Sequence, residues 1–548
     1  MTWPTHEVSN QAPPLVDHNL FEQDTALRDA VGQRLPQALP ALTSMGAELG
    51  AADLQAAAEE ANRFLPELHL FDRVGNRLDQ VRFHPSWHRL LESLCRHGMH
   101  AQAWLQPEPH AHFRRAAGYY LHAQLESGSM CPVTMSFASV PLLQKEPALF
   151  DSLRAKFAAN VHDPRDLPLA HKRGILVGMG MTEKQGGSDV RSNASSARPA
   201  SSAQGRGEAY LITGHKWFFS APMCDAHLVL ARAPGGLSCF FVPRFRPDGS
   251  KNAVLVQQLK DKLGNRSNSS SEVEFQDAWG CMVGEEGRGI PTIIEMAGIT
   301  RLDCVIGSAG LMRAALLQAI HHTRHRSAFG RPLAQQPLMK NVLCDLALES
   351  EAAMHLMLRL ASTLDEEADP LQRILRRVMT PAAKFWVCKR ALEFTGECME
   401  TWGGNGYVET GPMARFYREA PVNSIWEGSG NIMCLDVLRA IERDPAGYAA
   451  LLGSMRPACA EHAGMMQIHQ RLQQALASPG PDMEMQARGF AQDLVLLMQC
   501  CLMLEGAPMA VADAFIVSRM HGGHGRVYGT LAPAQVSDSL LERALPCA

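Results

Sequence analysis

The sequence lacks the cysteine spacing of a disulfide framework or a zinc site. Its 14 cysteines are scattered over 548 residues without a CxxC pair, and most lie in apolar stretches. Cysteines used in this way are typical of reduced core residues. The first 20 residues also lack a basic segment followed by an apolar one, so we predict no signal peptide and a cytoplasmic location.

Long apolar runs and an excess of positive charge are missing as well. The late apolar run at residues 494–504 is bounded by Asp493 and Glu505 and is too short to span a bilayer, so no membrane partner is expected. The net charge of −4 gives no general attraction to nucleic acid. Lys389 is the last lysine, and residues 440–548 carry seven arginines against ten acidic residues.

The patterning that is present divides the chain into four parts. Residues 1–177 are predicted to be mainly helical, whereas residues 178–285 contain short β-branched and aromatic runs typical of a small β-barrel or sandwich. Residues 286–443 return to long helical periodicity, as in a helical bundle, and residues 444–548 continue as a further helical region. The expected fold is mainly α with a central β-barrel domain and an extra C-terminal helical domain.

A polar loop with paired glycines follows an apolar segment at Gly180–Ser192, which reads GMTEKQGGSDVRS. Glycine pairs permit close approach of backbone to a ligand, and Thr182, Ser188 and backbone N–H groups then form an acceptor-binding nest. The alternative is an ordinary glycine turn capped by Ser188 and Asp189. The loop is not a Rossmann fingerprint, because Glu183 stands where the third glycine belongs and no short βαβ unit follows.

A second candidate site is the turn Ile425-Trp426-Glu427-Gly428-Ser429-Gly430, which opens a helix predicted over residues 431–441. Partial desolvation beside Trp426 raises the pKa of a carboxyl group toward that of a general base. A position at a helix N-terminus lowers the pKa instead. The residues alone leave these two interpretations of Glu427 open.

Two further segments contain residue types that are found in ligand sites. Gly214–Ser220 is predicted to be a strand, and its aromatic side chains either line the barrel core, as we expect for Phe219, or face a ligand. His321 and His325 share a helical face, but no carboxylate follows in the manner of zinc proteases, so we predict no metal site.

These segments together resemble the acyl-CoA dehydrogenase superfamily. The flavin-binding pattern GMTExxGGSD of that family matches Gly180–Asp189 at every specified position. The resemblance implies FAD as cofactor and an acyl-CoA dehydrogenase-like architecture. It makes Glu427 the base that removes the α-proton of an acyl-CoA thioester while flavin N5 accepts the β-hydride, with Trp426 replacing the usual tyrosine.

The same resemblance supplies a set of cofactor-binding residues. Phe218 and Ser220 fall on the positions that cover and hydrogen-bond the flavin ring, and Arg326 opens an RxxFGxxL pattern that meets the pyrophosphate of a neighbouring subunit. The full predicted set is Met179, Gly180, Met181, Thr182, Gly187, Ser188, Phe218, Phe219, Ser220, Arg326, Phe329, Gly403, Gly404, Trp426, Gly428, Ser429 and Asn431. A site shared between subunits implies a homotetramer.

Other segments, among them Val81–His88, Cys131–Met135 and Pro421–Met433, resemble the AidB-like alkylation-response branch of the superfamily. That resemblance implies weak acyl-CoA dehydrogenase activity, double-stranded DNA as a partner, and an acyl-CoA or another small electrophile as ligand. The candidate DNA-binding residues are Arg439, Arg443, Arg456, Arg471, Arg519 and Arg526. The charge count of the C-terminal region does not support DNA binding, which depends on the resemblance alone.

The resulting hypothesis is an FAD-binding protein of the adaptive response to DNA alkylation, which protects DNA from alkylating agents or inactivates them. Two alternatives stay open. One is an authentic short- or branched-chain acyl-CoA dehydrogenase, and the other is a non-enzymatic DNA-associated protein in which FAD is structural.

Overall fold

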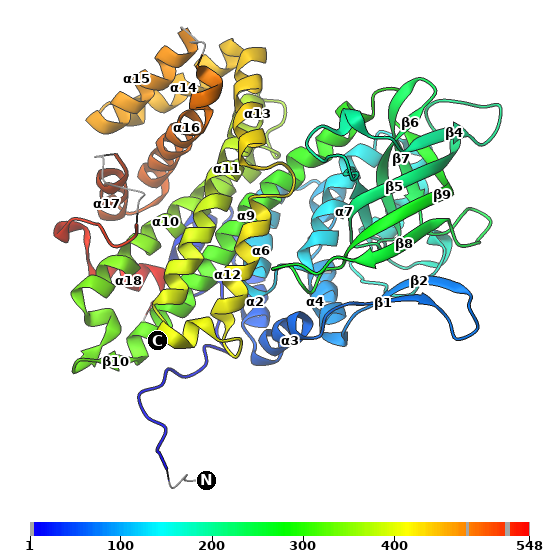
Figure 1. The fold of residues 1–548 in the computed structure, drawn as a ribbon. Helices are drawn as coiled ribbons and strands as arrows, with labels where there is room; N and C mark the ends of the chain where they lie inside the picture. The colour runs from blue at the N-terminus through cyan, green and yellow to red at the C-terminus, as the bar shows by residue number, and fades with distance from the viewer. Residues whose placement is uncertain (1–4, 478–481, 521–526, 547–548) are drawn as a thin grey trace. The chain divides into compact units, whose positions relative to one another are not determined.

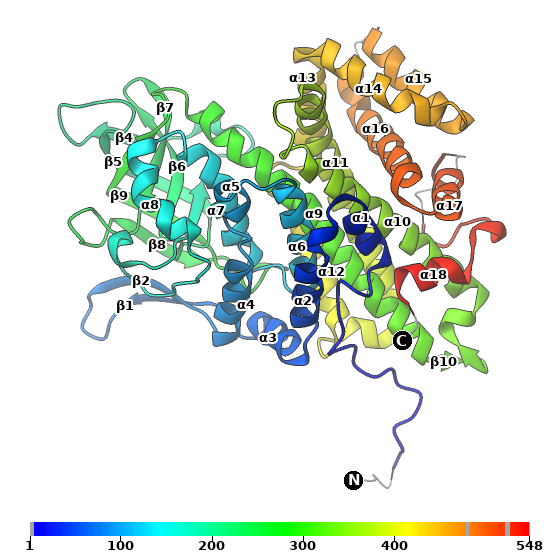
Figure 2. The same ribbon diagram turned by 180° about the vertical axis from the view of Figure 1, so that it is seen from behind.

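The computed structural model describes residues 5–477, 482–520 and 527–546. By its internal contacts the chain forms two compact units (Figures 1 and 2). Unit 1 comprises Met1–Gln55, His112–Leu125 and Cys304–Ala548, and unit 2 comprises Ala56–Ala111 and Glu126–Asp303. Each unit is described by itself.

Unit 2 is built around a closed, barrel-like sheet. Strands β4, β5, β9 and β7 follow one another from β6, and a further β6–β7 pairing closes the ring, while β3 pairs with β6 and β8 with β9. The strands are β3 (Val177–Gly180), β4 (Ser196–Pro199), β5 (Ala209–Ser220), β6 (Ala226–Ala233), β7 (Gly236–Pro243), β8 (Val254–Leu259) and β9 (Ser270–Val283). The predicted barrel is therefore confirmed.

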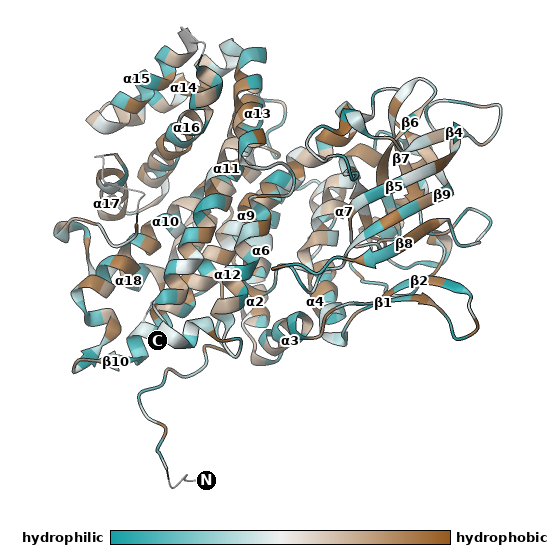
Figure 3. Ribbon diagram, viewed as in Figure 1, coloured by the Kyte–Doolittle hydropathy of each residue, from teal (hydrophilic) through white to brown (hydrophobic). Residues whose placement is uncertain are grey.

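The barrel forms because alternate side chains of its strands point into one apolar core. Tyr210, Ile212, Phe240 and Phe275 are fully or almost fully buried in that core. Hydrophilic and hydrophobic residues are mixed along the strands, as a half-exposed sheet requires (Figure 3). The strand predicted at Gly214–Ser220 is confirmed as the second half of the longer strand β5, whose pairing with β9 is irregular after Lys216.

The remaining elements of unit 2 are mostly helices, as predicted, with one exception. Strands β1 (Glu67–Phe71) and β2 (Arg77–Arg82) form an antiparallel hairpin that the helical prediction for residues 1–177 missed. The helices that lie within unit 2 are α4 (Pro85–Arg96), α5 (Gln102–Leu105), α7 (Met130–Leu143) and α8 (Pro147–Ala158). Helix α3 (Ala52–Arg63) begins in unit 1, and α9 (Gly289–His325) begins in unit 2 and ends in unit 1.

Unit 1 is a helical assembly centred on α11, which packs against α12, α13, α14 and α16. The bundle helices are α1 (Thr25–Arg34), α2 (Leu39–Leu49), α6 (Ala111–Leu125), α10 (Pro337–Ser362), α11 (Pro370–Glu400), α12 (Pro412–Asn423) and α13 (Gly430–Arg443). The C-terminal helices are α14 (Pro445–Cys459), α15 (Ala463–Ala477), α16 (Met483–Gly506), α17 (Met509–Met520) and α18 (Asp538–Ala544). The expected extra C-terminal helical region is therefore present.

In the part of the chain that the structure describes, two helices, α9 and α16, are long and apolar enough to cross a membrane by length and composition. The apolar run at residues 494–504 belongs to the longer helix α16, whose 24 residues exceed the length expected from sequence. In both helices the most apolar window is largely inside the protein, 83% for α9 and 72% for α16. Such burial is typical of core helices.

Candidate flavin site and catalytic turn

The glycine loop after β3 is anchored by a buried ion pair. Glu183 and Lys216 are both inaccessible to solvent, and Lys216 Nζ lies 2.7 Å from Glu183 Oε1. Lys216 also donates to the carbonyl oxygen of Leu230 on β6 at 2.7 Å, and the backbone N–H of Ala194 donates to Glu183 Oε2 at 2.6 Å. The pair therefore ties both ends of the loop to the barrel wall.

The contact with Lys216 favours the charged form of Glu183. Burial alone raises the pKa of Glu183, but the ammonium group of Lys216 and the hydrogen bonds to the carboxylate outweigh burial and hold the pKa at about 2. Sequence reasoning missed this anchor. The available signal was Lys216, a charged residue directly before the aromatic run Trp217-Phe218-Phe219 on the predicted strand.

The outer side of the loop presents small polar groups. Thr182 is half-buried, and its backbone carbonyl oxygen accepts a hydrogen bond from the N–H of Trp217 at 2.8 Å. A Cβ atom at Gly187 would lie 2.7 Å from Thr182 Oγ1, so a larger residue does not fit there. Gly187 and Ser188 are exposed. Hydroxyl and backbone N–H donors of this kind suit the oxygen and nitrogen acceptors of FAD.

On strand β5, Phe218 and Ser220, the residues predicted to cover and hydrogen-bond the flavin ring, differ in their exposure. Phe218 is 53% exposed, with the Lys260 ammonium 4.7 Å from its ring centre, and Ser220 is half-buried. Phe219 is 1% exposed and stacks on His227 at 4.0 Å, in the core position expected for it. The ring available to cover a flavin is therefore that of Phe218.

Met179, Gly180 and Met181 support this surface from the barrel side. Met179 and Gly180 are buried on β3, and a Cβ at Gly180 would lie 2.6 Å from the ring of Phe219. The carbonyl oxygen of Met181 accepts from Asn193 Nδ2 at 2.8 Å. Their geometry fits backbone contacts with a cofactor.

The turn predicted to carry the catalytic base, Glu427, lies in unit 1, between α12 and α13. Glu427 is half-buried and has a positive φ of 58°. This backbone conformation is costly for a residue other than glycine and is commonly held at functional sites. Lys384, buried in α11, donates to the carbonyl oxygen of Gly428 at 2.7 Å, and Trp426 Nε1 donates to Asn423 Oδ1 at 3.0 Å. These two bonds hold the turn on both sides of Glu427.

The start of α13 carries the other predicted residues of this turn. Ser429 and Asn431 are exposed, and Asn431 Oδ1 accepts from Arg488 Nε of α16 at 2.9 Å. Helix α13 begins at Gly430, where a helix N-terminus favours anionic groups. The predicted helix over 431–441 is confirmed within its observed span of Gly430–Arg443.

Four more of the predicted cofactor-binding residues, Arg326, Phe329, Gly403 and Gly404, also lie in unit 1. Arg326 donates through Nη1 to the carbonyl oxygen of Asn10, whose side chain bonds Ser327. Phe329, on the short β10–β11 hairpin (Ser327–Ala328 and Arg331–Pro332), is 98% exposed. Gly403 and Gly404 are exposed at the start of a 3-10 turn, and Gly403 has a φ of 58°.

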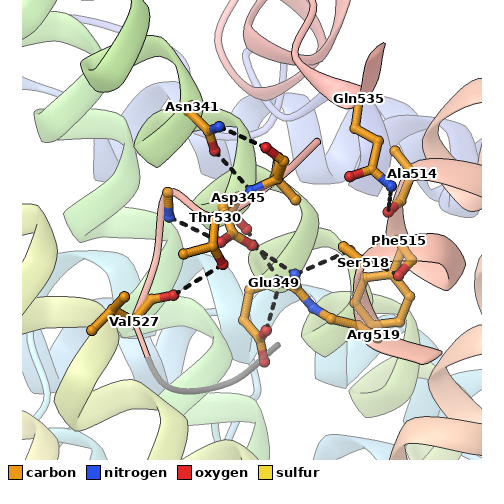
Figure 4. A network of polar contacts seen from close by, with 12 residues as sticks. Asn341, Asp345, Glu349, Ala514, Phe515, Ser518, Arg519, Val527, Thr530 and Gln535 are labelled. Carbon is orange, nitrogen blue, oxygen red and sulfur yellow. Dashed lines mark hydrogen bonds and ion pairs between the residues drawn. The ribbon is translucent and has the colours of Figure 1, made fainter. Parts of the chain in front are cut away.

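The six candidate DNA-binding arginines do not form one set. Arg439 and Arg443 on α13 and Arg456 on α14 are exposed, and Arg471 is exposed but lies 2.6 Å from Asp493. The prediction that Arg519 binds DNA is wrong, because its side chain is 1% exposed and is paired with Asp345 and Glu349, so it cannot contact phosphate (Figure 4). Arg526 lies outside the described residues.

Among residues 5–477, 482–520 and 527–546, no group of three or more His, Cys, Asp or Glu side chains is placed to hold a metal ion. His321 Nε2 and His325 Nδ1 each contact a carbonyl oxygen at 2.8 Å, of Pro13 and of His321 respectively.

A barrel with a flavin-type loop and a helical bundle with a glutamate turn define an acyl-CoA dehydrogenase type of protein. Three family models match in chain order: the adaptive response protein AidB N-terminal domain over residues 10–164, the acyl-CoA dehydrogenase middle domain over 178–278 and its C-terminal domain over 287–442. The chain is 46% identical over 549 residues to AidB of Escherichia coli, named as an acyl-CoA dehydrogenase, with 99% of both chains covered.

Solved structures agree with this grouping. The apo form of Bd2924 has a TM-score of 0.83 at 28% identity and covers 91% of this chain and 99% of its own. ACDH-11 of Caenorhabditis elegans in complex with C11-CoA has a TM-score of 0.83 at 21% identity, covering 98% and 92%, and supports the fold. The chain belongs to the acyl-CoA dehydrogenase family, in its AidB branch, and FAD is the cofactor of that family.

Proposed function

We propose that the protein is an FAD-dependent flavoprotein of the alkylation response that retains acyl-CoA dehydrogenase chemistry, with Glu427 as its base. The observation that carries the proposal is the strained backbone of Glu427, held by the buried ammonium of Lys384 on the next carbonyl group. A carboxylate kept in a costly conformation by its surroundings is typical of a catalytic position.

The chemistry of the chain follows from this turn. FAD, when bound, supplies a hydride acceptor. A carboxylate oxygen of Glu427 takes the α-proton of an acyl thioester, and Lys384 and Trp426 keep the turn from relaxing. In unit 2, Thr182, Ser188 and Ser220 are the hydroxyl groups that would hold the cofactor, with the ring of Phe218 covering it.

The test is a panel of short, branched and long acyl-CoA substrates mixed with purified holoprotein while flavin absorbance is followed. We expect slow bleaching that Glu427→Gln reduces by about a hundredfold or more, the range of a lost general base. Glu442→Gln, an exposed change on α13, the helix that follows the Glu427 turn, is the matched control and should bleach like the wild type. Bleaching that is unchanged in Glu427→Gln rejects Glu427 as the base.

The rate and range of bleaching separate the alternatives. Rapid bleaching by one short or branched acyl-CoA favours an authentic dehydrogenase. A spectrum silent to every acyl-CoA and to a model alkylating agent favours a non-enzymatic protein with structural FAD. Loss of the alkylating agent together with a flavin change favours inactivation of small electrophiles.

We also propose weak, non-specific association with double-stranded DNA, supported by the similarity to AidB and by exposed arginines on α13 and α14. Arg439 and Arg443 are four residues apart on α13 and share a helix face. Arg456 on α14 is the third arginine of the proposed set. Their contribution is expected to fall steeply with salt. An electrophoretic shift that is absent at low salt, or unchanged by Gln at all three positions, contradicts this proposal.

A homotetramer in the cytoplasm completes the proposal. Phe329, Leu338 and Tyr407 are 98%, 83% and 81% exposed in the single chain. Large apolar side chains exposed to this extent are typical of surfaces covered by another subunit.

A further inference from the structure

A cavity of 370 Å³ lies wholly within unit 2 and is lined by none of the residues assigned above to FAD. Its wall comes from the end of β2 and the first half of α4, from residues 161–176, from residues 221–225 after β5, and from Arg244 after β7. This volume is in the range of small-molecule sites.

One part of the cavity wall is aromatic and aliphatic. Phe83 and Trp87 stack with ring centres 3.8 Å apart and an interplanar angle of 13°. Leu91, Ile175 and Leu176 are buried beside them in the same lining. This wall suits the apolar body of a ligand.

Two hydrogen-bond donors of the lining have no acceptor among the described residues. Trp87 is 5% exposed and its Nε1 is buried and unpartnered, and Nη2 of Arg244 is in the same state. The other terminal nitrogen of Arg244, Nη1, lies 2.9 Å from Asp166 Oδ1 as an ion pair, and that oxygen has no hydrogen-bond donor among the described residues. Buried donors without acceptors are costly, so a ligand that supplies an acceptor is favoured here.

The charges of the lining favour an anionic acceptor. Every lining carboxylate already has a cation within 3.0 Å: Asp163 with Arg165, Asp166 with Arg244 and Lys251, and Asp225 with Lys172. Arg82 is an exposed lining residue for which no ion pair is found among the described residues. The residues of the lining therefore carry one more positive charge than negative charges.

The remaining polar groups of the lining are uncharged. His88 Nδ1 and His162 Nε2 are 2.9 Å apart, and burial lowers the pKa of both imidazoles, that of His162 to about 3. Burial also raises the pKa of the Cys224 thiol, so no thiolate nucleophile is present. These groups favour holding a ligand over reacting with it.

We propose that this cavity binds a small organic monocarboxylate with an aromatic or branched apolar body. The carboxylate accepts from Trp87 Nε1 and Arg244 Nη2, and the body lies against Phe83 and the aliphatic wall. The proposal rests on unit 2 alone and does not depend on the proposed catalytic function.

The test is a calorimetric and ligand-observed NMR titration of the purified full-length protein with benzoate, benzamide and benzylammonium. Benzoate is expected to bind saturably, benzamide about tenfold more weakly and benzylammonium not at all, since a hydrogen bond to a charged group is stronger than one to a neutral group. Absence of saturable benzoate binding, or equal binding of benzoate and benzamide, overturns the proposal.

Variants place the binding in the cavity. Trp87→Phe keeps the ring but removes the N–H and is expected to weaken benzoate about tenfold, the effect of one hydrogen bond to an anion. Trp386→Phe removes the same group from another buried tryptophan whose Nε1 lacks an acceptor among the described residues, outside the cavity, and should change nothing.

Two further variants cover the case in which Trp87→Phe does not fold. Val161→Phe fills the cavity and is expected to abolish benzoate binding. Arg82→Gln is an exposed change that lowers the affinity about threefold at low salt and not at high salt, as screening requires. An affinity unchanged in both variants places benzoate elsewhere and overturns the proposal.

Discussion

Glu183 and Lys216 show how one residue pair shapes a binding surface. Because both charges are fully buried, each depends on the other for compensation. Neither side chain reaches the outer face of the loop, and Thr182 and Ser188, on either side of Glu183, carry the exposed or half-exposed hydroxyls. The pair therefore acts by holding the backbone of the loop after β3 in place.

Replacing Lys216 with methionine tests this role. The change leaves the Glu183 carboxylate buried without a partner and is expected to destabilise the protein by about 3–5 kcal/mol and to lower FAD occupancy. Urea unfolding and the flavin-to-protein absorbance ratio measure both effects. Lys145→Met, which breaks the exposed pair of Lys145 with Glu295, is the control, with an expected cost below about 1 kcal/mol. Equal costs of the two changes contradict the assignment.

The same pair predicts a pH dependence. The folded pKa of Glu183, about 2, lies below the ordinary value of 4.5. The carboxylate therefore contributes its full stability above pH 4.5 and loses it as the pH falls from 4.5 toward 2. The difference in unfolding free energy between the wild type and Glu183→Gln should shrink in that window. Glu295→Gln, which breaks an exposed pair with Lys145, is the control and should cost less than about 1 kcal/mol at neutral pH. A gap that widens with acid contradicts the prediction.

At the scale of elements, α17 is held to α10 by a buried charge network. Arg519 lies 2.6 Å from Asp345 and 2.9 Å from Glu349, and Asp345 also accepts from the N–H of Gly529 at 3.0 Å (Figure 4). Arg390 of α11 pairs with Glu349 from the other side. The network therefore joins three helices of unit 1 through charges that have no access to solvent.

Removal of the arginine tests the network. Arg519→Met leaves two carboxylates with Arg390 as the remaining cation and is expected to cost about 3–5 kcal/mol, with faster hydrogen exchange in α17 than in α13. Arg471→Met on α15, which breaks an exposed pair with Asp493, should alter neither quantity measurably. Unchanged exchange in α17 after Arg519→Met contradicts the network as its anchor.

Elements were predictable from sequence where local pattern and tertiary environment agree. The barrel runs and the helix after Glu427 show clear periodicity, so they were found. The β1–β2 hairpin was missed because β1 has no fully buried residue and because one of the two buried positions of β2 is the polar Asp79, so the sequence shows no apolar alternation there. Arg519 was misassigned because a sequence does not show that α10 offers two buried carboxylates. The contacts of the site residues named by motif with FAD stay predictions.

At the scale of the whole molecule, the exposed apolar residues of unit 1 require an explanation. Phe329 has a positive φ of 50° as well as almost complete exposure, a combination that is costly for a bulky residue in a free hairpin. Leu338, at the start of α10, and Tyr407 add to the exposed apolar area of the same unit. A neighbouring copy of the chain that buries Phe329 offsets both costs, because burial of an aromatic side chain contributes about 1.5–3 kcal/mol.

Phe329→Ser therefore tests the proposed tetramer. We expect the wild type to have the mass of four chains by light scattering after gel filtration, and the variant to shift to smaller species without loss of helical circular dichroism, since the residue makes no core contact in its own chain. Phe71→Ser on the β1–β2 hairpin, where the ring is 54% exposed, is the matched control and should keep the wild-type mass. A wild type that is monomeric, or a Phe329→Ser variant that keeps the full mass, would show that the exposed ring serves another partner. Loss of FAD together with loss of mass would further indicate that Arg326 and Phe329 act on the cofactor of a neighbouring subunit, because the two residues share one hairpin.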